Sequence, residues 1–125
     1  MRVLVLSGIV LALAACSTPA DDITSALDQS HTAVASVALA AELVDHGGLP
    51  TSSLVASTTD AMAELQDATK TLSELTDQAT KRDAALAAID EARDAVIAVQ
   101  DALARGSTLD GARDALERAD EGLTR

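Results

Sequence analysis

The single cysteine, Cys16, is the residue whose type and surroundings most clearly suit a chemical reaction. It follows Leu13, Ala14 and Ala15 at the end of an apolar run that begins at Val3. A cysteine thiol is the best nucleophile in the chain for forming a thioether. The small side chains before it leave the backbone open to an enzyme. Cys16 is therefore a candidate site of covalent modification.

Residues 13–16 resemble the lipobox of bacterial lipoproteins. The resemblance implies that a signal peptide, residues 1–15, is cleaved between Ala15 and Cys16, and that Cys16 then carries the lipid. Such proteins bear two or three acyl chains, palmitate among them, which is enough for stable anchoring. The implied location is the extracytoplasmic face of the cell membrane. Ser17, a residue other than aspartate, resembles the signal for transfer to an outer membrane in cells that have one.

The same segment also has the general build of a secretory signal. A positive charge at Arg2 precedes the apolar run, and that run is too short to span a bilayer, which takes about 20 residues. An alternative reading exists, because Ala12, Leu13 and Ala14 fit the small-x-small pattern of ordinary signal cleavage. That cleavage would release a non-lipidated secreted helical protein.

Composition and charge narrow the possible partners. The 125 residues include 20 acidic and 9 basic side chains, for a formal net charge of −11, and no Phe, Tyr or Trp. A surface of this charge repels nucleic acid and anionic headgroups. Without aromatic rings the chain cannot stack on bases or sugars. We expect no nucleic-acid partner and, with Cys16 used for lipid, no disulfide.

The rest of the chain predicts an all-α domain. We expect a lipid-anchored tether at 16–22 and a helical domain at 23–125. The first helix should run from about 21 to 46 and end at the glycine pair 47–48. Ser57 with Asp60, and Ser107 with Asp110, fit the pattern that starts a helix.

A heptad pattern occupies the middle of the chain, where residues 51–105 contain no glycine or proline. Its positions alternate by four and three and include Ala61, Leu65, Ala68, Leu72, Leu75, Ala79, Arg82, Leu86, Ile89, Arg93, Val96, Gln100 and Leu103. This favours an elongated antiparallel bundle of three helices with a long central helix. The alternative is a four-helix up-down bundle broken near Thr80, which could cap a new helix together with Asp83.

The second half of the first helix is apolar nearly all round. Val37 and Val44 fall on one face, and Leu39 and Leu43 point to the other. The pattern fits a helix that touches two neighbours, which we favour, or an exposed patch that receives a partner.

Other polar residues do not form a convincing reactive site. Asp83, Asp90, Asp94 and Asp101 line one helix face, but they are spread too widely for one cation and suit a solvated surface. The two histidines, His31 and His46, cannot meet within one helix, and zinc needs three or four converging ligands. We expect no catalytic residue, no metal and no cofactor, and hence no enzyme.

Two function classes remain. The first is a small helical lipoprotein that acts as a structural or interaction protein for an unknown envelope partner. The second is a carrier of a small apolar ligand between loosely packed helices. A homodimer is also possible, because the long central seam exceeds what the two shorter helices can cover.

Replacing Cys16 with Ala tests the lipobox. We expect the membrane form of the wild-type protein to lack residues 1–15 and to carry added acyl mass by intact mass spectrometry. Cys16→Ala should accumulate as an uncleaved precursor. Cleavage of this variant, with release of soluble protein outside the cell, would contradict lipidation.

Overall fold

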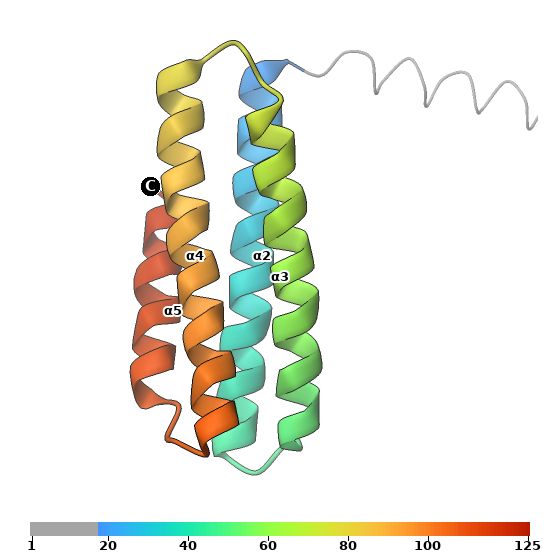
Figure 1. The fold of residues 1–125 in the computed structure, drawn as a ribbon, viewed down its shortest axis with the longest axis vertical. Helices are drawn as coiled ribbons and strands as arrows, with labels where there is room; N and C mark the ends of the chain where they lie inside the picture. The colour runs from blue at the N-terminus through green and yellow to red at the C-terminus, as the bar shows by residue number, and fades with distance from the viewer. Residues whose placement is uncertain (1–17) are drawn as a thin grey trace, which may run out of the picture.

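Four α-helices make up the described part of the chain, residues 18–125, in the computed structural model (Figure 1). They are α2 (Pro19–Asp45), α3 (Thr51–Ser73), α4 (Ala79–Arg105) and α5 (Asp110–Leu123). No strand occurs within these residues. The expected all-α class is confirmed. The expected anchor residues Ala15 and Cys16 lie outside the described residues.

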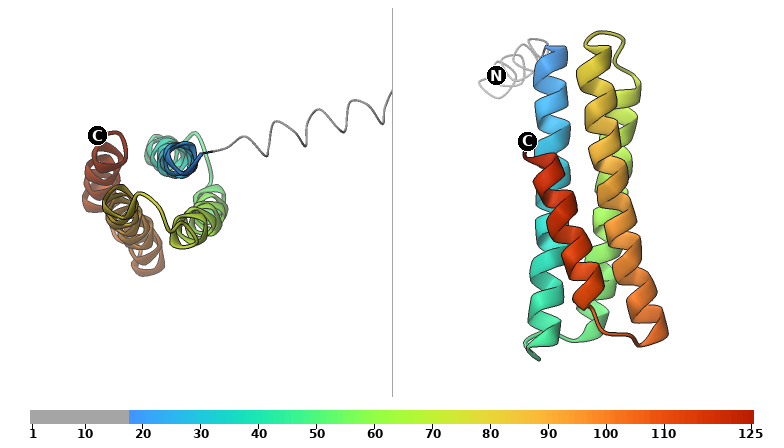
Figure 2. Two further views of the ribbon diagram at one scale, coloured as in Figure 1. Left: turned by 90° about the horizontal axis from the view of Figure 1, so that it is seen from above. Right: turned by 90° about the vertical axis from the view of Figure 1, so that its left-hand side faces the viewer.

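The helices form an up-down-up-down bundle. Each helix runs antiparallel to the next in the chain, and α5 closes the ring by packing on α2 (Figure 2). The two helices α2 and α4 also touch across the centre. Because α5 is 14 residues long and α2 is 27, α5 covers only the half of the bundle far from Pro19. The bundle therefore has three helices at the Pro19 end and four at the other.

The prediction of a single long central helix is wrong. The chain leaves α3 after Ser73 and enters α4 at Ala79, so the heptad positions divide between two antiparallel helices that pack on each other. The four-helix alternative has the right number of helices. Its break was placed slightly late, because Thr80 lies inside the first turn of α4 and does not cap it.

Two features of the loop at 74–78 explain the turn without glycine or proline. Gln78, the residue before α4, takes a left-handed backbone conformation with φ +62°. The Nη1 atom of Arg82 donates a hydrogen bond to the carbonyl oxygen of Leu75 at 2.7 Å. Arg82 thus holds the loop against α4 rather than filling a heptad seam.

The possible homodimer was argued from the long central seam, and the structure divides that seam between α3 and α4. Leu72, which would lie at the centre of a seam between two copies, is fully buried within one bundle. The buried faces of α3 and α4 are covered by their neighbours in the same chain. The structure offers no long uncovered seam in residues 18–125 for a second copy.

The other helix boundaries also differ from expectation. Thr18 caps α2 with Asp21 in a reciprocal capping box, so residues 19–22 belong to the helix rather than to the tether. The helix α3 begins directly after Pro50, which leaves Ser57 in its interior. The N-cap of α5 is Leu109, and no side chain caps that helix.

Small aliphatic side chains fill the core. The largest fully buried apolar residues are Leu54, Leu65, Leu72, Ile89, Leu116, Val34, Val37, Val96 and Val99, and many alanines lie between them. Two hydroxyl groups are buried with them. Ser30 donates to the carbonyl of Ala26 at 2.8 Å, and Thr58 donates to that of Val55 at 2.7 Å.

Gln100, a polar heptad position, contributes a link between helices. Its Nε2 donates to Thr58 Oγ1 at 3.4 Å and so joins α4 to α3 through a buried hydroxyl group. The Thr58 hydroxyl is satisfied both as donor and as acceptor. Such a buried polar pair favours one alignment of α3 and α4 over others.

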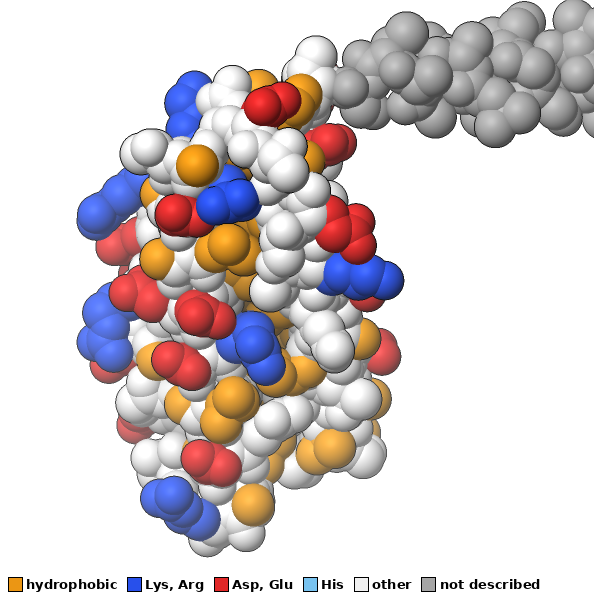
Figure 3. All heavy atoms as spheres, turned by 45° about the horizontal axis from the view of Figure 1, so that its top comes forward, with side chains coloured by type: hydrophobic (Ala, Val, Ile, Leu, Met, Phe, Trp, Pro, Cys, Tyr) orange, Lys and Arg blue, Asp and Glu red, His pale blue; other side chains and the backbone are white. Residues whose placement is uncertain are grey.

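The surface that shows α3, α4 and the Pro19 end is polar. Acidic and basic side chains are interspersed along its left-hand side, and apolar atoms are visible in the furrow between the helices (Figure 3). None of the helices in residues 18–125 is long and apolar enough to cross a membrane.

A pair of adjacent residues tests the core. Leu54→Ala should lower the free energy of unfolding by about 3 kcal/mol, because it opens a cavity at a side chain with no exposure. Val55→Ala should cost less than about 1 kcal/mol, since Val55 is 48% exposed. Urea unfolding followed by circular dichroism measures both. Equal losses would contradict this packing of α3.

Candidate functional site

The candidate site is a groove between α2 and α5. Its volume is about 700 Å³, and it runs along both helices. The apolar lining comes from Val34, Ala35, Ala38 and Leu39 of α2 and from Leu116 of α5. Val34 and Leu116 are buried beneath it, whereas Leu39 stands 58% exposed at its edge. The groove therefore offers apolar surface to a partner without opening the core.

The sequence of α2 explains why this groove has an apolar edge. Val37 and Ala41 face the interior and are fully buried, as the helix touches α3, α4 and α5. Leu39 and Leu43 remain 58% and 38% exposed because they lie on a side of α2 that no other helix covers. The helix α2 touches more than one neighbour, as the favoured interpretation predicts, and it still leaves two leucines in solvent. That they receive a partner stays a prediction.

Carboxylates line both sides of the groove. Asp110, Asp114 and Glu117 stand at i, i+4 and i+7 on α5, a spacing that places them along one edge of a helix. Glu42 of α2 adds a fourth. In residues 18–125 none of these four has a basic side chain within ion-pair distance.

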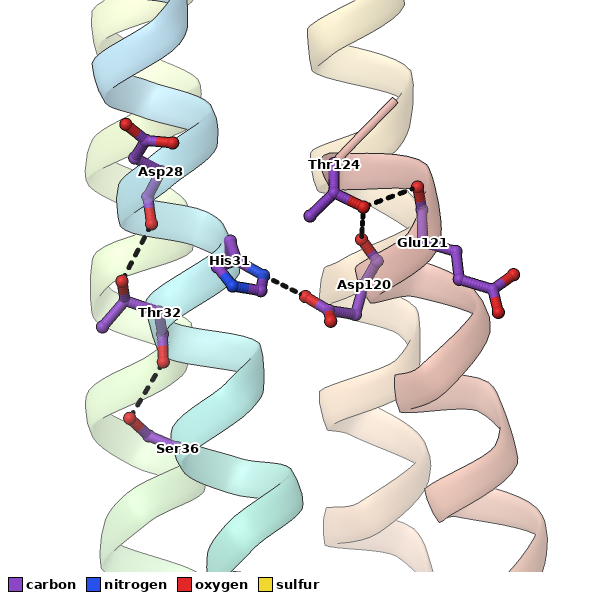
Figure 4. A network of polar contacts seen from close by, with 7 residues as sticks. All are labelled: Asp28, His31, Thr32, Ser36, Asp120, Glu121 and Thr124. Atoms are coloured by element: carbon purple, nitrogen blue, oxygen red, sulfur yellow. Dashed lines mark hydrogen bonds and ion pairs between the residues drawn. The ribbon is translucent and has the colours of Figure 1, made fainter.

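Two polar contacts tie α5 to α2 at the ends of the groove. The Nη1 atom of Arg113 in α5 donates a hydrogen bond at 2.9 Å to Oδ2 of Asp45, the last residue of α2. Toward the Pro19 end, His31 of α2 points at Asp120 of α5 and hydrogen-bonds with its carboxylate (Figure 4). All four side chains are about one-third exposed or more, so each tie contributes little to stability and mainly sets position.

The structure separates the remaining candidate residues. His31 contacts α5, whereas His46 forms the exposed C-cap of α2. Asp83, Asp90, Asp94 and Asp101 all lie exposed on α4. Asp83 pairs with Arg82 at 3.1 Å, and Asp90 lies 3.9 Å from Arg93. Within residues 18–125 no three His, Cys, Asp or Glu side chains converge on a metal position.

Sequence reasoning missed the acidic edge of α5. The i, i+4, i+7 spacing of Asp110, Asp114 and Glu117 is visible in the sequence, but it does not say which neighbour that edge faces. The contact between His31 and Asp120 joins residues 89 apart, which no local pattern indicates.

Two further grooves are smaller. One of about 450 Å³ lies between α4 and α5. Both acidic and basic side chains line it, including Glu91, Asp94, Arg118 and Arg125. The other, of about 190 Å³, separates α2 from α3. Neither has an exposed leucine at its edge, as the groove between α2 and α5 does.

The fold and the groove place the described chain in a general class: a four-helix up-down bundle with an acidic, apolar-lined surface groove. Comparison with protein-family models, with curated proteins and with solved structures found no match.

Removing the two ties should loosen α5 selectively. In the double variant His31→Ala with Arg113→Ala, we expect amide exchange in α5 to speed up a few-fold, because each tie is worth less than about 1 kcal/mol. Exchange in α3 should stay unchanged. Arg118→Ala, which removes a cation from the opposite side of α5, is the matched control. Equal acceleration in control and double variant would contradict a positioning role.

Proposed function

We propose that this chain is a lipid-anchored lipoprotein of the bacterial envelope whose helical bundle binds another envelope protein. The observation that carries the proposal is the lone Cys16, preceded by Leu13, Ala14 and Ala15. The bundle also supports this proposal, because its first helix begins at the cap Thr18, close to the expected lipid site. Only Ser17 separates the expected lipid site from that cap.

This short connection would set the height of the groove above a membrane. With a rise of about 1.5 Å per residue, α2 is about 40 Å long. The groove residues 34–42 of α2 would then stand roughly 20–35 Å beyond Pro19. The net charge of −11 favours a bundle that stays off anionic headgroups. A groove at that height suits contact with a protein of the envelope rather than with lipid.

A carrier of a small apolar ligand has less support. A volume of about 700 Å³ falls within the range of ligand pockets. However, the groove is open to solvent along its length, and the fully buried Leu54, Leu65 and Leu72 fill the space between the helices. An apolar ligand would leave much of its surface in water there. The interaction function makes better use of an open groove.

In-cell photo-crosslinking tests the interaction function. We expect a photoreactive residue in place of Leu39 to produce a discrete protein adduct in the membrane fraction. The same residue in place of Thr71, which is exposed on α3 at the Pro19 end, should not. The function would be contradicted if a photoreactive residue produced no adduct at any of three exposed positions, Leu39, Leu43 and Val55. Loss of lipid and of signal cleavage in Cys16→Ala is a separate result and concerns only the anchor.

A further inference from the structure

We infer that the groove between α2 and α5 is a docking site for a basic amphipathic helix of a partner protein. The inference names the chemistry of the partner and rests on the proposed interaction function for its cellular setting. The binding itself concerns only residues 34–42 and 110–120, so it can be measured whether or not Cys16 carries lipid.

The apolar part of the site is already exposed in the folded bundle. Leu39 stands 58% exposed at the edge of the groove, and Leu43, four residues further along α2 and just outside the groove lining, is 38% exposed. Both would lose contact with water beneath a partner helix, which favours binding. Covering them would not require any buried side chain of the bundle to move, because Val34 and Leu116 already close the floor.

The charged part of the site selects the sign of the partner. Of the six charged groove residues, Arg113 is engaged by Asp45 and Asp120 by His31. That leaves Glu42, Asp110, Asp114 and Glu117, all acidic and all exposed. Lys or Arg side chains of a partner would relieve the mutual repulsion of these carboxylates.

The spacing of these carboxylates points to a helix. Asp110, Asp114 and Glu117 follow one another along α5 at intervals of about 6 Å and 4.5 Å. A helix with Lys or Arg at i, i+4 and i+7 repeats those intervals, with its apolar residues beside them on the same face. The groove spans about 11 residues of α5, so a partner helix would contact it over roughly three turns.

Charge also disfavours the other occupants. A second copy would bring its own acidic groove edge against this one, and an anionic lipid headgroup would meet the same carboxylates. The groove between α4 and α5 contains Arg118 and Arg125 beside its acids, so it would not select a basic helix.

A tryptophan-labelled peptide provides the test. The protein has no aromatic residue, so all tryptophan fluorescence comes from the peptide. The peptide would have about 18 residues, enough for a helix, with Lys at i, i+4 and i+7, Leu on the adjoining positions and one Trp among them. It is titrated into the full chain in neutral detergent, with protein-free micelles as baseline. We expect saturable one-to-one binding, a blue-shifted emission, and weakening as salt is raised.

Charge reversal locates the binding. Asp114→Lys with Glu117→Lys should weaken the affinity about tenfold or more, because two attractions become repulsions. The matched control, Asp67→Lys with Asp101→Lys, makes the same change of net charge at exposed positions of α3 and α4 and should stay within about twofold. Circular dichroism checks the helix content of each variant. Should the first variant fail to fold, Leu39→Ser replaces it, with an expected weakening of a few-fold.

Four results would overturn the inference. They are absence of peptide binding, equal weakening in both charge variants, equal affinity for a small cationic amphiphile such as dodecylamine, and concentration-dependent dimers that Leu39→Ser abolishes. The first two remove the site or make it a general charge effect. The third assigns the groove to a small ligand, and the fourth assigns it to a second copy.

Discussion

The bundle depends on α2, which contacts all three other helices, as α4 also does. A helix in that position must be apolar on more than one side, and α2 achieves this with small side chains, since no aromatic residue is available. Ala33, Ala40 and Ala41 bring its neighbours close, while Val34 and Val37 supply bulk. Because α5 packs on one side of α2 only, this wide apolar surface is not completely covered. Leu39 and Leu43 are exposed as a consequence of how α2 organises the core.

Polar groups then decide how the helices align. A core of alanine, valine and leucine packs in several registers with similar free energies, because its side chains differ little in shape. The hydrogen bond from Gln100 to Thr58 is available in one register of α3 against α4. On the other side of the bundle, the contacts of Arg113 with Asp45 and of His31 with Asp120 fix α5 along α2. These residues contribute specificity more than stability.

The helical class, the first helix and the final helix could be predicted from apolar spacing and from Gly47 and Gly106, both of which have positive φ. The break between α3 and α4 could not. Heptad spacing continues across it, from Leu72 to Leu86, because each helix follows the same period on its own. The turn depends on Gln78 in a left-handed conformation that glycine normally adopts, and on Arg82 reaching back to Leu75. For the site, the sequence left two interpretations of the leucines on the first helix, and one of them was an exposed patch. Which helix the acidic edge of α5 faces could be known only from the fold.

The unequal lengths of the helices divide the molecule along its axis. At the Pro19 end, three helices pack together and the loop held by Arg82 closes them. At the far end, α5 adds a fourth helix, and with it both the acidic edge and the groove. With an anchor at Cys16, the end with fewer packed helices would lie near the lipid, where attachment limits its freedom. The better-packed end would face outward and keep the two sides of the groove at a fixed separation. A preorganised groove loses less conformational entropy when it binds, so in the proposed function the short final helix would serve recognition as well as packing.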